Sequence, residues 1–288
     1  MSDAPAPAPR GASRTAVGVA ALRWLHQSVD GEPKVLDDPL SGPLLGESVL
    51  RTVAAHLGDP HAPALRELRA HVVLRSRFCE DHLAAAVARG VTQLIVLGAG
   101  LDTFAYRQPA WARQLRIYEV DHPDSQAQKR HLLAQAQIAI PDNVEFVAID
   151  FEQTSLADGL KAAGVDSSRQ SFFSCLGVTM YLSAAAVDAL FGLVAQFPAG
   201  SEIVFTYQPE AQAAESALGR RAGALGEPWT YHISHRSLAR KLKALGFQAL
   251  EELAPRAAQA RYFQDRTDGL RAPSRRGIAA AVVGVAPK

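Results

Sequence analysis

From residue 93 onward the chain alternates short apolar runs with amphipathic stretches. The apolar runs are rich in Val, Ile and Phe, have the length of buried strands, and occupy residues 93–97, 116–120, 144–149, 171–176 and 201–207. Stretches with helical periodicity lie between them, over residues 125–136, 156–163 and 184–197. This alternation predicts βαβ units, and therefore an α/β fold whose parallel sheet carries helices on both faces.

The pattern changes after the fifth apolar run. Residues 209–234 contain no clear strand pattern and predict a helical insertion. A helix over 236–245 and a strand near 247–250 follow, and an arginine-rich polar loop then precedes a last strand within 277–286. Because no crossover of the βαβ type separates the last two strands, we expect the seventh strand to be antiparallel.

The part of the chain before residue 93 has a helical pattern without strands. Residues 15–25 carry apolar side chains at three- and four-residue spacing, and Ser13 is a suitable N-cap. The turn at residues 37–39 predicts the start of another short helix. Residues 65–89 predict one or two further helices, which Gly90 ends.

These patterns divide the chain into three parts. The Ala-Pro alternation within residues 1–12 predicts a disordered tail. Residues 13–90 form the predicted helical cap, and residues 91–288 the predicted ligand-binding domain. Within that domain we expect the insertion at about 209–234 to act as a substrate lid.

Composition and charge restrict the class of protein. The 288 residues are 48% hydrophobic and 20% charged, as in a globular protein with a large core. A net charge of +1 predicts no general attraction to nucleic acid or to anionic membranes. No apolar run approaches the roughly 20 residues of a membrane span. The only cysteines, Cys79 and Cys175, favour a reducing, cytoplasmic setting over a disulfide framework.

A glycine-rich turn follows the first predicted strand. It contains Gly98 and Gly100, and Thr103 stands where a pyrophosphate-binding turn usually has a third glycine. Asp121 ends the second predicted strand and Asp150 closes the third. Carboxyl ends of parallel strands meet at one edge of the sheet, so these residues indicate a nucleoside site, with Asp121 at the ribose.

Charge at this edge distinguishes between possible nucleosides. Asp102, Glu119, Asp121 and Asp150 are poor neighbours for a pyrophosphate but suit a sulfonium and an ammonium group. Asp150 offers an acceptor for an adenine amine, and the backbone at Phe151 addresses a ring nitrogen. The preferred cofactor is therefore S-adenosylmethionine.

Two other ligand classes fit less well. A nicotinamide-dependent oxidoreductase would have a third glycine and a Tyr-x-x-x-Lys pair, and the segment that begins at Tyr181 lacks the lysine. His232 and His235 lack further ligands at suitable spacing, so we expect no metal site.

Three longer motifs resemble those of the leucine carboxyl methyltransferase family, which includes bacterial S-adenosylmethionine-dependent O-methyltransferases, some of them acting on polyketides. The motifs cover residues 96–107, 118–123 and 177–182, and the regions around residues 13–16 and 38–39 are also similar. The resemblance implies a Rossmann-like, seven-stranded class I methyltransferase sheet with an antiparallel last strand. It extends over nearly the whole chain from Ser13.

The resemblance also implies roles for individual residues. Gly98 and Gly100 would line the methionine and sulfonium part of the cofactor, with Asp121 at the ribose and Asp150 and Phe151 at the adenine. Arg75 would pair with the cofactor carboxylate, for which a bidentate guanidinium is suited, and Arg77 is the competing candidate. Leu176 occupies a position where some family members have an acid that contacts the ammonium group. Backbone carbonyls of Gly98 or Leu176 would then take over that contact.

Methyl transfer from a sulfonium is an in-line displacement that depends mainly on positioning. A carboxylate acceptor is already ionised at neutral pH, whereas a hydroxyl acceptor benefits from a general base. His122, His232 and His235 are the candidate bases, although His122 alternatively caps the helix that begins near Pro123. Tyr181 either orients the acceptor oxygen or packs with its hydroxyl bonded locally.

The acceptor should lie between the cap and the insertion. Met180, Phe205, Trp229 and Tyr231 would form an apolar pocket for it or belong to the core. The predicted function is S-adenosylmethionine-dependent O-methylation of a carboxylate or hydroxyl on a small molecule, such as a polyketide or another secondary metabolite. The alternatives are a nicotinamide-dependent oxidoreductase and, because of Leu176, a non-catalytic S-adenosylmethionine-binding protein. We expect a monomer or a homodimer.

Overall fold

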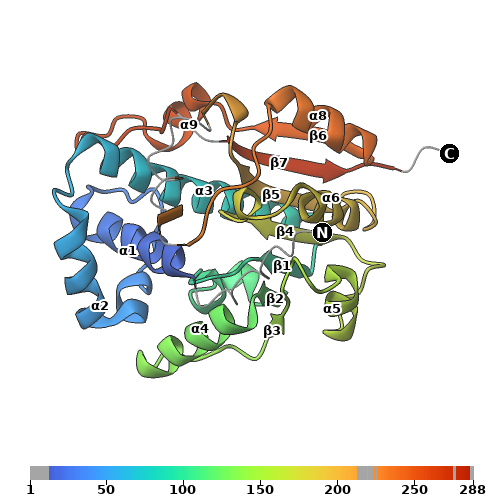
Figure 1. Ribbon diagram of the computed structural model, residues 1–288, viewed down its shortest axis with the longest axis horizontal. Helices are drawn as coiled ribbons and strands as arrows, with labels where there is room; N and C mark the ends of the chain where they lie inside the picture. Colours follow the sequence, from blue (N-terminus) through green and yellow to red (C-terminus); the bar gives the residue numbers. More distant parts are fainter. Residues whose placement is uncertain (1–12, 213–218, 220–222, 225, 275–276, 286–288) are drawn as a thin grey trace, which may run out of the picture.

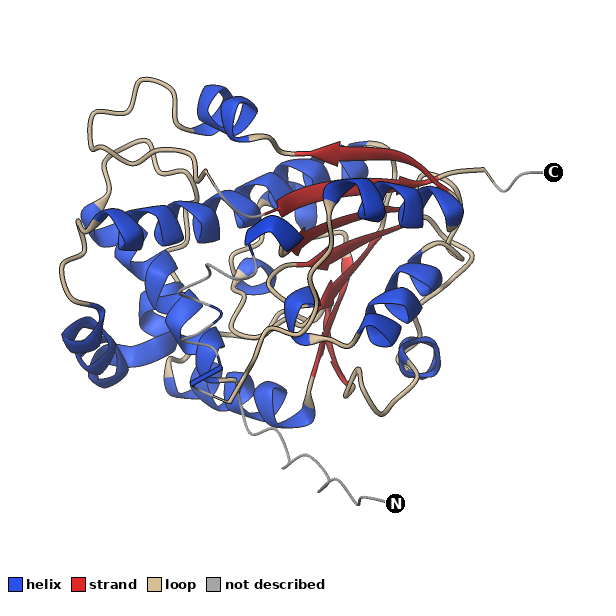
Figure 2. Ribbon diagram, turned by 45° about the horizontal axis from the view of Figure 1, so that its top comes forward, coloured by secondary structure: helices blue, strands red, loops and turns tan. Residues whose placement is uncertain are grey.

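One seven-stranded sheet organises the protein (Figures 1 and 2). The computed structural model describes residues 13–285 except for 213–218, 220–222, 225 and 275–276. The strands are β1 (Gln93–Leu97), β2 (Arg116–Asp121), β3 (Val144–Ala148), β4 (Ser171–Cys175), β5 (Glu202–Tyr207), β6 (Phe247–Glu252) and β7 (Gly277–Val283). Their order is β3-β2-β1-β4-β5-β7-β6, and β7 is antiparallel to both of its neighbours. The predicted fold class, including the antiparallel last strand, is confirmed.

Helices precede the sheet and alternate with its strands. They are α1 (Arg14–Val29), α2 (Ser41–Leu57), α3 (Pro63–Ala88), α4 (Pro123–Gln135), α5 (Leu156–Ala162), α6 (Ala184–Val194), α8 (His235–Ala244) and α9 (Pro255–Tyr262). The prediction of an arginine-rich loop between β6 and β7 was wrong in part, because α9 lies within that segment. Pro255 occupies the first turn of α9, but Ala258 is its only buried residue, so hydrophobic periodicity did not reveal the helix.

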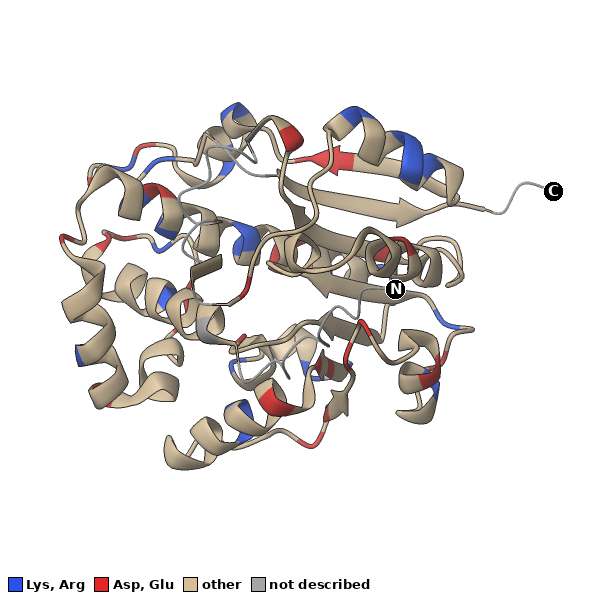
Figure 3. Cartoon of the chain, viewed as in Figure 1, with Lys and Arg blue, Asp and Glu red and all other residues tan. Residues whose placement is uncertain are grey.

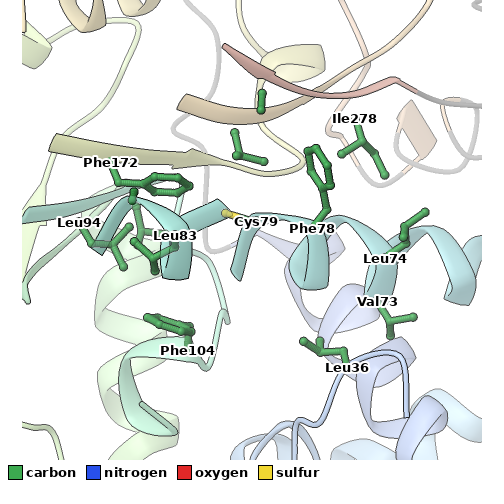
Figure 4. Packing of buried hydrophobic residues seen from close by; sticks show 14 of the residues in the cluster. Leu36, Val73, Leu74, Phe78, Cys79, Leu83, Leu94, Phe104, Phe172 and Ile278 are labelled. Atoms are coloured by element: carbon green, nitrogen blue, oxygen red, sulfur yellow. The ribbon is translucent and has the colours of Figure 1, made fainter. Parts of the chain in front are cut away.

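Helix α3 covers one face of the sheet, where Phe78 and Leu83 pack with Phe172 of β4 and Ile278 of β7 (Figure 4). Helices α5, α6 and α8 cover the opposite face. There Phe191 of α6 meets the ring of β5 residue Phe205 edge-on, with 5.0 Å between centroids. All five residues of β1 are buried because both faces are covered, which explains its uninterrupted apolar sequence.

Helices α1, α2 and α3 form a layer beside the sheet edge, at the left of Figure 1. Buried ion pairs fix them to one another. Both carboxylate oxygens of Asp30 accept hydrogen bonds from Arg69, at 2.6 and 2.8 Å, and Arg23 donates to Asp38 at 2.7 Å. Lysines and arginines gather along α8 (Figure 3).

The segment after β5 returns across the sheet edge. Pro209 and Ile233 form an isolated β-bridge, and Thr230 N donates to Met180 O at 2.7 Å. Within the predicted helical insertion, the described residues comprise a short 3-10 helix over Glu210–Gln212, helical residues at 219 and 223–224, and the non-helical residues 226–234. The prediction for 213–218, 220–222 and 225 lies outside the described residues. None of the helices in the described ranges combines the length and apolar composition of a membrane span.

Candidate active site

A cavity of about 800 Å³ lies at the carboxyl edge of the sheet, where ligands of open α/β sheets bind. Its walls come from helices α1 and α3, the turn after β1, the loops that follow β2 to β5, and residues 226–229. The walls include the residues preferred for cofactor binding and catalysis: Arg75, Gly98, Gly100, Asp121, His122, Asp150, Phe151, Leu176 and Tyr181. The topology thus brings together residues that are separated by more than a third of the chain, such as Arg75 and Tyr181.

The turn after β1 requires glycine at Gly98. Its φ of +68° is in the left-handed region, and a Cβ there would lie 2.3 Å from Val178 Cγ2. The backbone N–H groups of Gly98 and Ala99 both donate to Val120 O, at 2.8 and 3.1 Å. The turn is therefore held between the ends of β2 and β4, where its backbone faces the cavity in which a ligand would bind.

Thr103 anchors this turn from the side away from the cavity. Its hydroxyl accepts a hydrogen bond from Arg107 Nε at 3.1 Å, and Arg107 lies 3.6 Å from the Asp38 carboxylate. Arg23 joins the same network, since it donates to Asp38 and, at 2.6 Å, to Leu101 O. Sequence reasoning missed Arg23, because nothing in the local pattern of α1 indicates a contact with the glycine turn.

Asp121 lies at the end of β2, facing the same turn. Its carboxylate accepts hydrogen bonds from the backbone N–H of Gly100 and from His122 N, the latter at 2.7 Å. Burial raises the pKa of Asp121, against the opposing effect of these two hydrogen bonds. Two carboxylate oxygens offer more acceptor sites than these two donors use, so Asp121 retains capacity for ribose hydroxyls.

His122 and Asp150 lie together at the ends of β2 and β3. His122 caps α4, with Nδ1 accepting from Asp124 N at 3.2 Å, so the alternative role as helix cap is confirmed. In the neutral ring Nε2 then carries the proton, and Nε2 lies 3.9 Å from Asp150 Oδ2. The other Asp150 oxygen accepts from Glu152 N at 3.0 Å. His122 is thus placed beside the residue predicted to meet the adenine.

Arg75 extends from α3 to the end of β4. A Cβ on Gly177 would lie 2.7 Å from Arg75 Nη1, so the guanidinium packs against the backbone that follows Leu176. Arg77, the competing candidate, instead pairs with Asp81 at 2.8 Å on the exposed side of the helix. Of these two arginines, the cavity includes Arg75 alone.

Tyr181 lies where the cap meets the segment that returns after β5. Its hydroxyl is 3.5 Å from Thr15 Oγ1, which donates to the Glu227 carboxylate at 2.5 Å. Ser13 Oγ donates to the same carboxylate at 3.1 Å. The rings of Tyr181 and Trp229 meet edge-on, with 6.4 Å between centroids. This contact set joins the start of α1, the loop after β4 and the returning segment in the cavity wall.

Several residues considered from the sequence lie elsewhere. His232 and His235 are not in the cavity walls, and His235 pairs with Glu252 at 2.7 Å. Phe205 and Tyr231 are buried in the core, whereas Met180 and Trp229 do line the cavity. The cavity also includes His71, a buried residue of α3 that sequence reasoning missed. Within the described ranges no three His, Cys, Asp or Glu side chains are grouped as metal ligands.

Comparison with known proteins agrees with this geometry. The family described as "Leucine carboxyl methyltransferase" matches residues 16–195, which include α1, the glycine turn, the end of β2 and the loop after β4. The chain belongs to the leucine carboxyl methyltransferase family. The resemblance seen in the motifs is confirmed, and the chain is a methyltransferase that uses S-adenosylmethionine.

Individual relatives support the assignment. A Bacillus subtilis (strain 168) protein named "Putative S-adenosyl-L-methionine-dependent methyltransferase YktD" is 34% identical over 209 residues, which cover 69% of this chain and 67% of that protein. A Streptomyces coelicolor protein of the same description, SCO7813, is 31% identical over 224 residues, covering 77% of this chain and 78% of its own length.

Solved structures show the same fold at low identity. A duf574 family protein from Streptomyces avermitilis superposes with a TM-score of 0.58 at 16% identity, covering 96% of this chain and 98% of that one. A methyltransferase-like protein from Thermobifida fusca, described as putative, gives a TM-score of 0.57 at 19% identity, covering 91% and 98%.

The chemistry of the cavity walls fits this cofactor. Their charged side chains are four carboxylates and two guanidiniums: Asp102, Asp121, Asp150, Glu227, Arg23 and Arg75. An excess of carboxylates favours a ligand with a sulfonium and an ammonium over one with a pyrophosphate, and so disfavours the nicotinamide alternative.

Proposed function

We propose that the chain is an O-methyltransferase that methylates a carboxylate or hydroxyl of a small, largely apolar molecule such as a polyketide. One observation carries the proposal: a single cavity joins the polar strand edge, where a nucleoside fits, to an apolar part formed by the cap. A cofactor and an acceptor could therefore meet without crossing solvent. When bound, S-adenosylmethionine supplies an activated methyl group.

The proposed cofactor contacts follow the strand order. Asp121 binds the ribose hydroxyls, and Asp150 with the backbone of Phe151 binds the adenine. Arg75 binds the carboxylate of the methionine part, because a guanidinium matches that group in a bidentate geometry. Gly98 and Gly100 let the backbone approach the sulfonium. His122 then belongs to the adenine end, where its position beside Asp150 supports a binding role over that of a base.

The proposed acceptor site lies in the cap. Helices α1 and α3 contribute the apolar side chains Val19, Leu22, Leu68 and Val72 to the cavity. Met180 and Trp229 extend this apolar wall from the strand edge and the returning segment, in keeping with a lid at about 209–234. Burial of an apolar acceptor body there is favourable at about 25 cal/mol per Å² of apolar surface.

The cap and the strand edge together position the acceptor oxygen. Tyr181 is the proposed orienting group, since this residue lines the cavity and is half-buried. Holding the two reacting atoms in line accounts for up to about 7–11 kcal/mol of a barrier in favourable cases. A carboxylate acceptor needs no base, so positioning alone would suffice for it.

Labelled methyl transfer tests the proposal. The purified protein is incubated with methyl-labelled S-adenosylmethionine and an extract rich in secondary metabolites, and the labelled product is identified. We expect label in an apolar small molecule, as an ester or ether. Asp121→Ala is the matched control, because it removes the ribose acceptor while leaving the cap intact.

Two other results would reject it. Binding of S-adenosylhomocysteine without transfer to any acceptor would indicate a non-catalytic binding protein. Label found on nitrogen, carbon or a protein would reject the O-methylation of a small molecule while leaving the methyltransferase assignment in place.

A further inference from the structure

We propose that Asp102 is the residue that binds the ammonium group of S-adenosylmethionine, in the position where Leu176 offers no side-chain acceptor. This inference rests on the proposed cofactor contacts. The methionine part of that cofactor is a zwitterion, so its site must supply an anion for the ammonium as well as a cation for the carboxylate.

The sheet order separates the two ends of the cofactor site. β2 and β3, which carry Asp121 and Asp150, lie on one side of β1, and β4 lies on the other. A nucleoside bound at the ends of β2 and β3 therefore directs its methionine part toward β4. Arg75 meets the β4 end through Gly177, which places the proposed partner of the carboxylate on that side.

Asp102 is on the same side. It follows the glycine turn and lines the main cavity, and it also lines a second, small cavity of about 20 Å³ together with Leu176 and Ser174. Ser76, the neighbour of Arg75 on α3, lines both cavities as well. An anion and a cation thus flank the end of β4, as a bound amino-acid zwitterion requires.

The Asp102 carboxylate is held in place but keeps acceptor capacity. Its Oδ1 accepts a hydrogen bond from Phe104 N at 2.7 Å, which orients the group. Among the residues that the structure describes, no ion pair within 4.0 Å involves Asp102. Its negative charge contributes to the raised pKa of the nearby Glu80, whose main cause is burial. The buried guanidinium of Arg107 attracts this charge, and an ammonium beside Asp102 would add to that compensation.

The other acids of the cavity are engaged differently. Asp121 and Asp150 lie on the nucleoside side of β1. Glu227 accepts hydrogen bonds from Ser13 and Thr15, at the first turn of α1 and on the acceptor side. Asp102 is therefore the lining carboxylate placed to meet an ammonium at β4.

Calorimetry with three ligands tests the assignment: S-adenosylhomocysteine, its deaminated analogue, and 5′-methylthioadenosine, which lacks the amino-acid part. Asp102→Asn removes the charge and keeps an oxygen acceptor for Phe104 N. We expect this variant to bind S-adenosylhomocysteine roughly tenfold to hundredfold more weakly. It should bind the deaminated analogue and 5′-methylthioadenosine within about twofold of the wild type, which also verifies its fold.

Asp158→Asn, an exposed site outside the cavity, controls for the change in net charge, and Glu227→Gln tests the rival acid. Equal loss for all three ligands in Asp102→Asn would overturn the proposal in favour of a structural role. Unchanged binding of S-adenosylhomocysteine would overturn it in favour of backbone carbonyls, and a selective loss in Glu227→Gln would overturn it in favour of that residue. Failure of the wild type to bind 5′-methylthioadenosine or S-adenosylhomocysteine would instead reject the proposed cofactor site.

Discussion

The cap and the strand edge both bury carboxylates, and Asp30 and Asp38 of the cap differ from Asp121 of the strand edge in how their charge is compensated. Burial opposes ionisation of Asp30 and Asp38, yet hydrogen bonds and attraction from arginines, joined at Asp30 by His26, lower the pKa of each below the ordinary value. At the strand edge, burial prevails and raises the pKa of Asp121, whose hydrogen bonds come from backbone N–H groups. Asp30 and Asp38 have cationic partners within the protein, whereas Asp121 accepts hydrogen bonds from two backbone N–H groups and is the proposed acceptor for the ribose hydroxyls.

This difference separates stability from binding. Removing an arginine from the cap leaves a buried carboxylate without its counter-charge, which costs folding free energy. Removing the charge of Asp121 relieves a cost of burial and instead weakens the ligand site. The predictions below test that separation, beginning with the largest expected effect.

Arg69→Met should lower the free energy of unfolding by about 3–5 kcal/mol, because it leaves Asp30 buried with only His26 as its side-chain partner. Urea denaturation of the variant measures this loss. Arg51→Met is the control, since Arg51 pairs with Glu47 on the exposed surface and should cost less than about 1 kcal/mol. Similar losses in both variants would contradict the role assigned to the buried pair.

Asp121→Asn should weaken the binding of S-adenosylhomocysteine by about tenfold to hundredfold, because ribose hydroxyls lose a charged acceptor. The free energy of unfolding should stay equal or rise, since the substitution removes a charge whose pKa burial raises. Calorimetry and urea denaturation of the same preparation provide both values. If the variant is destabilised and its affinity is unchanged, Asp121 stabilises the fold as the cap carboxylates do.

The affinity for S-adenosylhomocysteine should decrease as pH falls through the raised pKa of Asp121, by up to about tenfold per pH unit, because the ionised form accepts the ribose hydroxyls. The stability contribution of Asp121 has the opposite sense: it is present below the pKa of the unfolded chain and lost as pH rises through the folded pKa. Calorimetry from about pH 4 to about pH 8 measures the pH dependence of the affinity. In Asp121→Asn this pH dependence should be weaker.

The cap should respond to pH in the reverse direction. The pKa of Asp38 is lowered, so its stabilising contribution is present above the ordinary value of 3.8 and lost as pH falls through the folded pKa. Thermal melting in acid should therefore show a loss of stability in the wild type that is smaller in Asp38→Asn, in which Asp30 still contributes. A cap variant as acid-sensitive as the wild type would contradict this assignment.

Tyr181→Phe should have the smallest effect. Loss of one orienting hydroxyl should lower kcat/KM for the acceptor by less than about tenfold, with the Kd of S-adenosylhomocysteine unchanged. Steady-state kinetics with the identified acceptor provide the measurement. A hundredfold loss of kcat would instead make the tyrosine essential to the reaction, and a change in cofactor Kd would place it in the cofactor site.

The strand edge was largely predictable because its information is local. Each of Gly98, Asp121 and Asp150 follows directly after an apolar run, and parallel topology then brings strand ends together. The seven strands were predicted within a few residues, and the signal was strongest for β1, β4, β5 and β7, which are buried on both faces. Helix α9 was missed because it exposes most of its surface and so carries little periodic signal.

The cap was less predictable because its contacts join residues far apart in sequence. Arg23 pairs with Asp38 and with the backbone of Leu101. The local sequence pattern of these three segments does not indicate the contacts. The choice between Arg75 and Arg77 likewise depended on which side of α3 faces the cavity. Side chains two positions apart on a helix point in different directions, but only the packing of α3 on the sheet decides which of them faces the cavity.

The amino-acid sequence by itself therefore determined the fold class, the family and the strand-end residues of the proposed cofactor site, since these depend on hydrophobic periodicity and short contiguous motifs. Tertiary structure alone decided that His71 and Glu227 reach the cavity, that His232, His235 and Phe205 do not, and that Asp102 lies beside Leu176. Contacts between distant segments depend on how the helices pack around the sheet, and that packing is a property of the whole chain.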